Sequence, residues 1–421
     1  METARWLAAD GDLPGSLQLS VRGAWWWWSR GPRGPARELL ADLLERAQPS
    51  KEPGHRSDQL TARAWLGVFG SLSAQAALSL DVAERALLAG RRPAWTRHDA
   101  LAAVIIAERF YDRGDPIRAR RLLRLATRHF AVTENPQGEA LCGIVAARAQ
   151  LLGGEYVAAQ EATYQRLIEF QKLREPAGQV MCLDTLGYCA EVLGDLARAE
   201  TLHRQALELA RRHGAPEWEA AQLTRLGNVL ALAGTNNAQA YLKDATTLSA
   251  EIGSETILAL ARNGQGLALQ LSGDTAAASA EHSAAWAYYA EARSPAGLAY
   301  TGARLAVVQA ADRASAKRWA TESLQHAVPT RDPRAVAHSL ESLALVDDDP
   351  RTATLAGGAA WALRQSAAAP LPSLQQQPLS VRRRALARAL GSEFATLWRR
   401  GAGDPRGVAV GMAAGNAPAH R

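Results

Sequence analysis

Apolar residues recur at three- and four-residue spacing through most of the chain, which is the pattern of amphipathic helices. Residues 183–209 show it most clearly, because two apolar stripes follow one another across Gly194-Asp195. We therefore predict a helix, a tight turn and a second helix in this stretch. The first stripe consists of Leu183, Leu186, Ala190 and Leu193, and the second of Ala199, Leu202, Ala206 and Leu209.

A glycine followed by a small or polar residue marks the turn of this hairpin, and similar turns recur along the chain. Glycine accepts the left-handed conformation that ends a helix, and an acidic residue after it favours the positive end of the next helix. The glycines are 39, 41, 40 and 39 residues apart, too regular for the loops of an ordinary globular domain. They are Gly114, Gly153, Gly194, Gly234 and Gly273.

A single hairpin of this kind cannot cover its apolar faces, so neighbouring hairpins must stack into a continuous core. Weaker copies extend the array in both directions and bring the total to about nine hairpins. We predict an all-α fold, an α-solenoid superhelix over residues 1–400, and a disordered glycine- and alanine-rich tail over residues 401–421. The weaker copies span Trp25–Glu45, Trp65–Leu88, Leu305–Leu324 and Leu340–Leu363.

The clearest copy resembles a tetratricopeptide repeat, a motif that places small residues where helices approach closely. Leu186-Gly187 stands at the Leu-Gly position of that motif, and Ala199 and Ala206 stand at its two alanine positions. The period near 40 exceeds the family's roughly 34 residues, so the resemblance implies longer helices or loops. Later copies repeat the motif at Leu226-Gly227 and at Gly266, Ala278 and Ala285.

Segments at both ends carry a second resemblance. A run at Arg5–Asp12 precedes the tryptophans Trp25–Trp28, and the C-terminal part contains Ala369–Pro372, Ala385–Leu390, Gly391–Phe394 and Trp398. These segments are similar to the ends of the helical-repeat region of actinobacterial ATPase-coupled transcriptional regulators, of the Streptomyces antibiotic regulatory protein and large LuxR-type classes. The resemblance implies a sensor or partner-binding part, standing alone or cut from a larger regulator. The P-loop pattern G-x-x-x-x-G-K-[ST] of their ATPase module does not occur in this sequence.

Composition and charge narrow the class of partner. Lysine and arginine outnumber aspartate and glutamate by 48 to 42, a mild excess that does not indicate nucleic-acid binding by this chain alone. The densest basic run, Arg382–Arg384 with Arg388, fits a solvated helix face better than a phosphate-binding patch. We expect a cytoplasmic protein, because the chain has three cysteines, no signal-peptide pattern and no apolar run long enough to span a bilayer.

Residues with reactive side chains do not form a recognisable catalytic or metal site. Cys182 and Cys189 share one predicted helix face, and His203 lies on the next helix. A cysteine-histidine nucleophile or a metal site is conceivable there, but small buried side chains in a tight helix pair explain the pattern better. His282 stands at the position of His203 in a later repeat, which indicates repeat packing. We expect no cofactor, no metal and no enzymatic activity.

Polar residues on the first helix of several hairpins are candidates for a binding groove. In the tetratricopeptide register this helix faces the concave side, where polar side chains can hold a peptide or small ligand. A solvated helix face would show the same residues. The candidate groove residues are Asp184, Tyr188, Glu191, Thr224, Asn228, Asn263 and Gln270.

Two hypotheses follow for the function. The first is a non-enzymatic binding module that recognises a protein segment or a small ligand in the concave groove and acts in transcriptional or signalling regulation. The second is an enzyme of specialised metabolism in which Asp184 and Glu191 act as acid and base. The four tryptophans Trp25–Trp28 point to more than one side of a helix, so at least one should lie at the surface.

Overall fold

The computed structural model describes residues 1–415 except 32, 71–73 and 90–94, and these residues form 22 α-helices and no strand. The N-terminal helices are α1 Glu2–Ala9, α2 Leu13–Arg30, α3 Arg33–Arg46, α4 Pro53–Phe69, α5 Ala74–Leu87, α6 Arg97–Asp112 and α7 Pro116–Val132. The central helices are α8 Pro136–Leu152, α9 Tyr156–Lys172, α10 Pro176–Val192, α11 Leu196–Arg212, α12 Pro216–Leu232, α13 Ala238–Glu251, α14 Glu255–Ser272 and α15 Thr275–Glu291. The C-terminal helices are α16 Pro295–Val308, α17 Arg313–Thr330, α18 Pro333–Val346, α19 Pro350–Ser366, α20 Ser373–Leu390, α21 Glu393–Gly403 and α22 Pro405–Ala413.

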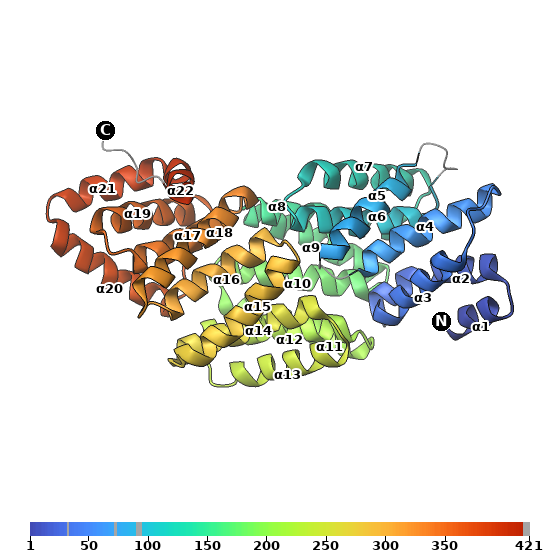
Figure 1. Cartoon of the computed structure of the whole chain (residues 1–421), viewed down its shortest axis with the longest axis horizontal. Coiled ribbons are helices and arrows are strands. Elements are labelled where there is room, and N and C mark those ends of the chain that lie inside the picture. Colours follow the sequence, from blue (N-terminus) through green and yellow to red (C-terminus); the bar gives the residue numbers. More distant parts are fainter. Residues whose placement is uncertain (32, 71–73, 90–94, 416–421) are drawn as a thin grey trace.

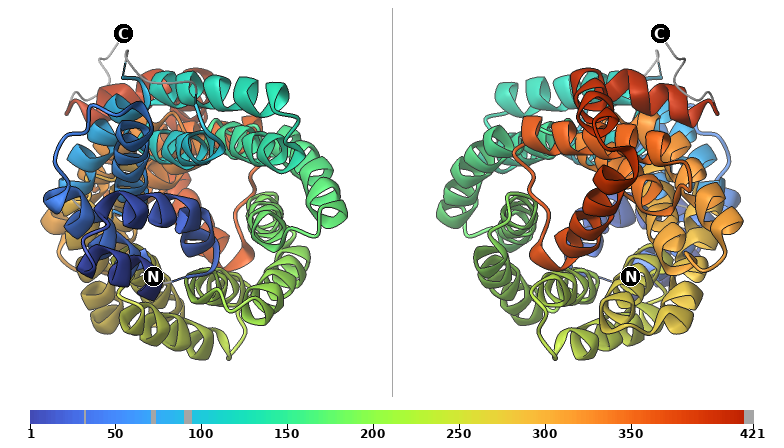
Figure 2. Two further views of the ribbon diagram at one scale, coloured as in Figure 1. Left: turned by 90° about the vertical axis from the view of Figure 1, so that its right-hand side faces the viewer. Right: turned by 90° about the vertical axis from the view of Figure 1, so that its left-hand side faces the viewer.

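Consecutive helices pack as pairs, and the pairs from α2/α3 to α18/α19 match the predicted hairpins one for one. The pairs stack into an elongated superhelix whose helices run around a common axis (Figures 1 and 2). The prediction of an all-α solenoid of tetratricopeptide-like hairpins is therefore confirmed. No helix of the described residues is long and apolar enough to cross a membrane.

The turns explain why the repeat is so regular. Left-handed glycines end the first helix of successive hairpins at Gly114, Gly154, Gly194 and Gly234, which are spaced 40 residues apart. Gly154, not Gly153, has the positive φ in its turn, because Gly153 still closes the helical end of α8. Most inner helices then begin with a proline in the first turn, where its fixed φ suits a helix and its missing N–H costs nothing.

Small residues let a buried histidine pack between the helices of two hairpins. A Cβ on Gly187 would lie 2.6 Å from the His203 ring, and one on Gly266 would lie 2.5 Å from the His282 ring. Nδ1 of His282 lies 2.8 Å from Oδ1 of Asn263. The equivalent position of His203 and His282 therefore reflects repeat packing, as the sequence indicates.

The prediction of a disordered tail is wrong for residues 401–413. Helix α21 continues through Gly403, and α22 packs on α17 and α19 with Val408, Ala409 and Met412 buried. A Cβ on Gly401 would lie 2.3 Å from the carbonyl oxygen of Leu355, so glycine here permits close helix contact. The glycine- and alanine-rich composition of residues 401–413 therefore permits tight helix packing and does not indicate disorder. Residues 416–421 lie outside the described residues.

The close approach of Gly266 to the His282 ring leads to a prediction about stability. Gly266→Ala should lower the free energy of unfolding by about 1–3 kcal/mol, because the added methyl group would overlap the buried ring. Urea unfolding followed by circular dichroism measures the change. Gly34→Ala is the matched control, since nothing lies within 4 Å of a Cβ there. Equal effects of the two substitutions would contradict the packing argument.

Buried histidine also makes the stability of the fold depend on pH. Burial lowers the pKa of His282 to about 2, and the unfolded chain titrates this group near 6.5. Below pH 6.5 the unfolded state therefore binds the extra proton, so stability falls as the pH falls, by up to about 1.4 kcal/mol per pH unit. His282→Gln should reduce the slope of stability against pH between about 6.5 and 5. Denaturant unfolding at several pH values measures the slope, and an unchanged slope in His282→Gln would contradict this account.

Candidate functional site

The even-numbered helices from α6 to α18 form the inner layer of the superhelix, because they contact one another along the stack. Their inner side chains include most of the candidate groove residues. Arg148 of α8 forms ion pairs with Glu108 of α6 and with Asp184 of α10, the latter at 2.8 Å. Gln222 of α12 donates its amide to the same Asp184 at 3.0 Å. The inner layer is thus linked by charged hydrogen bonds across four consecutive hairpins.

A second set of contacts joins two turns of the superhelix. Arg334, at the start of α18, donates to the hydroxyl of Tyr188 at 2.8 Å and to Glu191 at 2.7 Å, although these residues are 146 and 143 positions away. Beside them, the hydroxyls of Tyr156 and Tyr300 both donate to the carboxylate of Asp332. Part of the inner face is therefore closed by the chain itself.

The two carboxylates that we considered as an acid and a base are both ionised. Burial alone would raise the pKa of Asp184, but the charges of Arg225 and Arg148 outweigh it and hold the pKa at about 2. Burial opposes ionisation of Glu191 as well, and Arg334 again outweighs it and lowers the pKa. Neither group has the raised pKa that a general acid needs at neutral pH.

The other candidate groove residues separate into two classes. Thr224 donates to the carbonyl oxygen of Ala220 in its own helix, and Asn263 holds His282, so both serve internal packing. Asn228 and Gln270 each keep a buried side-chain oxygen that has no hydrogen-bond partner among the described residues. Of the candidate groove residues, only these two keep a buried side-chain polar atom without a partner among the described residues.

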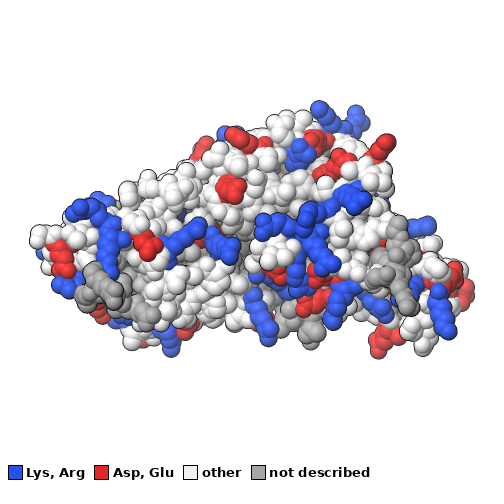
Figure 3. Space-filling view, turned by 90° about the horizontal axis from the view of Figure 1, so that it is seen from above, with Lys and Arg blue, Asp and Glu red and all other residues white. Residues whose placement is uncertain are grey.

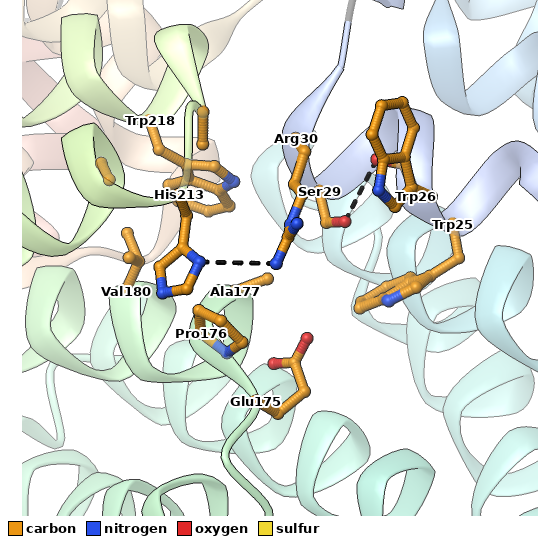
Figure 4. A pocket seen from close by; sticks show the side chains of 12 residues that line it. Trp25, Trp26, Ser29, Arg30, Glu175, Pro176, Ala177, Val180, His213 and Trp218 are labelled. Atoms are coloured by element: carbon orange, nitrogen blue, oxygen red, sulfur yellow. Dashed lines mark hydrogen bonds between the residues drawn. The ribbon is translucent and has the colours of Figure 1, made fainter.

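A pocket of about 270 Å³ lies elsewhere, between α2 and the α10–α12 region (Figure 4). Its walls come from two turns of the superhelix, since Arg30 and His213 approach within 3.4 Å across it. The aromatic wall consists of Trp25 and Trp26 on one side and Trp218 on the other. The remaining lining residues are Ser29, Arg30, Glu175, Pro176, Ala177, Val180, Ala210, His213 and Ala215.

Tryptophan packing sets the shape of this pocket. Trp28 is buried, stacks on Trp25 with ring centroids 5.0 Å apart, and meets Trp218 edge-on at 5.9 Å. Trp26 is 53% exposed, which confirms that the tryptophan run places one ring at the surface. The indole N–H of Trp218 is buried and has no acceptor among the described residues. An occupant of the pocket can therefore pack against the tryptophan rings.

Charged groups of both signs line the pocket. Burial raises the pKa of Glu175, although its carboxylate also accepts a hydrogen bond from the backbone N–H of Gly178 at 2.5 Å. Arg30 is exposed on the opposite wall and contacts His213, whose pKa is lowered mainly by burial. The pocket can hold an apolar group between rings and a polar group at either charged side chain.

Sequence reasoning missed this pocket except for its tryptophan run. Trp26 and Trp218 are separated by 192 residues, and no spacing rule relates them. The expectation that one tryptophan of Trp25–Trp28 lies at the surface was the one feature of the sequence that pointed to this pocket. The described residues contain no group of three or more histidine, cysteine or carboxylate side chains that could hold a metal.

One face of the molecule carries charges of both signs. In the view from above, basic side chains predominate and acidic ones lie among them (Figure 3). In the C-terminal basic run, Arg382 donates to the carbonyl oxygens of Ala344 and Asp347 and so satisfies the end of α18. Arg383 and Arg384 are exposed. The solvated-face interpretation of this run therefore accounts for its position.

Comparison with known proteins identifies the fold. No protein-family model and no curated protein sequence matches the chain. A Rap protein solved with Competence and Sporulation Factor is similar in structure, with a TM-score of 0.52, 13% identity, and coverage of 78% of this chain and 97% of that one. Two weaker likenesses have TM-scores of 0.44. One is a signal transduction ATPase with a tetratricopeptide repeat sensor from Pyrococcus horikoshii, at 14% identity, covering 86% of this chain and 55% of that one. The other is the Rap conjugation gene regulator of plasmid pLS20 with the Phr* peptide, at 12% identity, covering 90% and 96%.

The network around Arg148 should stabilise the fold strongly. Arg148→Met leaves Glu108 and Asp184 buried without their shared cation, so we expect a loss of about 3 kcal/mol in the free energy of unfolding. Chemical denaturation measures it. Arg212→Met, which removes an exposed pair with Glu208, should cost less than about 1 kcal/mol. A loss at Arg148 no larger than that at Arg212 would show that the network adds little.

Proposed function

We propose that this chain is a non-enzymatic binding module that recognises a segment of another protein and acts in transcriptional or signalling regulation. The observation that carries the proposal is the aromatic pocket between two turns of the superhelix (Figure 4). Its volume lies below the usual range for whole small-molecule ligands, so it suits one or two side chains of a longer segment. Aromatic anchors of this kind supply much of the affinity in protein recognition.

The chemistry of the pocket defines the anchor. An apolar or aromatic side chain of the partner enters between Trp26 and Trp218, where the indole faces exclude water. Arg30 and Glu175 stand at its margin and bind polar groups of the partner backbone beside the anchor. Asn228 and Gln270, with their unused oxygens, are the inner-layer residues that we propose as further contacts.

Further observations support a binding role, a regulatory setting and a cytoplasmic location, in that order. The Rap protein that shares this fold was solved with Competence and Sporulation Factor, so a superhelix of this type can hold a ligand. The resemblance of the two ends of the chain to regulator repeats supports a regulatory setting. The three free cysteines are buried thiols, which suits a reducing cytoplasm.

The position of the pocket also provides a mechanism. Its two walls belong to different turns, so an occupant that contacts both favours the arrangement in which these turns are close. A ligand shifts an equilibrium only by its difference in affinity for the two states. Occupancy would thus alter the spacing of the superhelix and the surfaces that it presents to a partner.

Selection from a library of short random peptides tests the proposal. We expect peptides enriched on the immobilised chain to share one apolar or aromatic position. Trp26→Ala should weaken their binding at least roughly tenfold, measured by fluorescence polarisation, because it removes one wall of the pocket. Since Trp26 is 53% exposed, its removal should leave the fold intact.

Trp361→Ala provides the matched control, because Trp361 is 48% exposed and lies on α19, outside the pocket. It should bind the selected peptides as the unmodified chain does. Failure to enrich any peptide over a blank surface, or equal loss of binding in both variants, would exclude the pocket as the recognition site.

A further inference from the structure

Arg304 of α16 is a largely buried cation that forms no ion pair of its own among the described residues. One of its terminal nitrogens donates to the backbone carbonyl oxygen of Asn263 at 2.8 Å, and its Nε is buried with no partner among the described residues. No ion pair within the described part of the chain includes Arg304, unlike Arg148 and Arg334 of the inner layer and Arg364 of α19. A buried guanidinium in this state is costly, because it has lost water without gaining an anion.

The arginines next to Arg304 already have counter-charges. Arg334 and Arg364 line the small pocket beside it, each already bound to one carboxylate, Glu191 and Glu341 respectively. His338 also lines this pocket, and burial lowers its pKa, so the ring is neutral; its Nδ1 faces the carboxylate of Glu341 at 3.6 Å and carries the proton, which leaves Nε2 as an acceptor. Each of the two pairs cancels its own charge. Arg304 therefore leaves the lining with one net positive charge and with its Nε–H as an unused donor.

The pocket that these side chains line is small and covered by the chain itself. Its volume is about 30 Å³, and Pro370, Pro372 and Gln375, from the segment between α19 and the first turn of α20, form one wall. The contact of Pro370 with Gly194 helps to hold this segment over the inner layer. The space thus suits a single small anionic group that approaches beside the segment, with the Gln375 amide available as a further donor.

Burial lowers the pKa of Arg304 but leaves its side chain charged at neutral pH. Desolvation and the nearby charge of Arg334 lower the pKa of Arg304 to about 10. The guanidinium therefore remains protonated at neutral pH. Tyr300, which also faces this pocket, donates its hydroxyl to Asp332 and keeps its proton, since burial raises its pKa well above the usual value. The anion would thus meet a fixed set of donors.

We propose that Arg304, with Arg334, forms a binding site for one carboxylate or phosphate group. Two features of the structure carry this assignment: the unpaired buried guanidinium and the pocket beside it. The site goes beyond the peptide-binding function, because it lies at the other end of α10 from the aromatic pocket. Glu175 and Glu191 mark the two ends of that helix, roughly 24 Å apart at 1.5 Å per residue.

Thermal unfolding of the full chain with sodium phosphate or sodium acetate as the probe tests the proposal. We expect at least one of these salts to raise the melting temperature of the unmodified chain by several degrees, since binding to the folded state alone stabilises it. Arg304→Gln should abolish that rise. Without either salt, the same variant should melt at a higher temperature than the unmodified chain, because an uncompensated cation has been removed.

Arg262→Gln is the control for general salt effects, since Arg262 is exposed on the neighbouring α14. It should respond to the salts as the unmodified chain does. A rise with phosphate only would assign a phosphate-bearing ligand, and a rise with acetate would assign a carboxylate. The proposal is overturned if Arg304→Gln responds to both salts as strongly as the unmodified chain, or if neither salt has an effect.

Discussion

Contact between successive turns of the superhelix is the constraint on which the rest of the structure depends. Stacked hairpins bury their apolar faces against neighbours, and that alone would leave an open coil. Here Arg334 reaches Tyr188 and Glu191 on the previous turn, and Arg33 pairs with Glu217 in the same way near the other end. These ion pairs close the coil on itself.

Closure changes what the inner face can do. Glu191 would line an open groove, but Arg334 from the other turn neutralises it and lowers its pKa despite burial. We then expect a ligand to bind where two turns of the superhelix leave a pocket between them. The aromatic pocket and the basic pocket beside Arg304 both lie at such places, and each takes side chains from elements far apart in the chain.

Most of the fold follows from local sequence rules. Glycine turns and apolar stripes predict each hairpin, because helix length and turn position depend on residues close together in the chain. The same rules fail at the C-terminus, where glycine and alanine in α22 obscure the helical period. That helix is held by contacts with α17 and α19, which sequence spacing does not report. Likewise, Gly153 and Gly154 are equivalent in the sequence until the backbone shows which one is left-handed.

The sequence by itself determined the helices, their pairing and the residues of the inner layer, since these depend on periods of a few residues and on a repeat of about 40. Only the tertiary structure decided which inner residues are available. Asp184, Tyr188 and Glu191 read as groove residues in the sequence, yet the partners that engage Tyr188 and Glu191 arrive from α18. The pitch of the superhelix brings these residues together, and pitch arises from the sum of small rotations at every hairpin interface, which no single segment encodes.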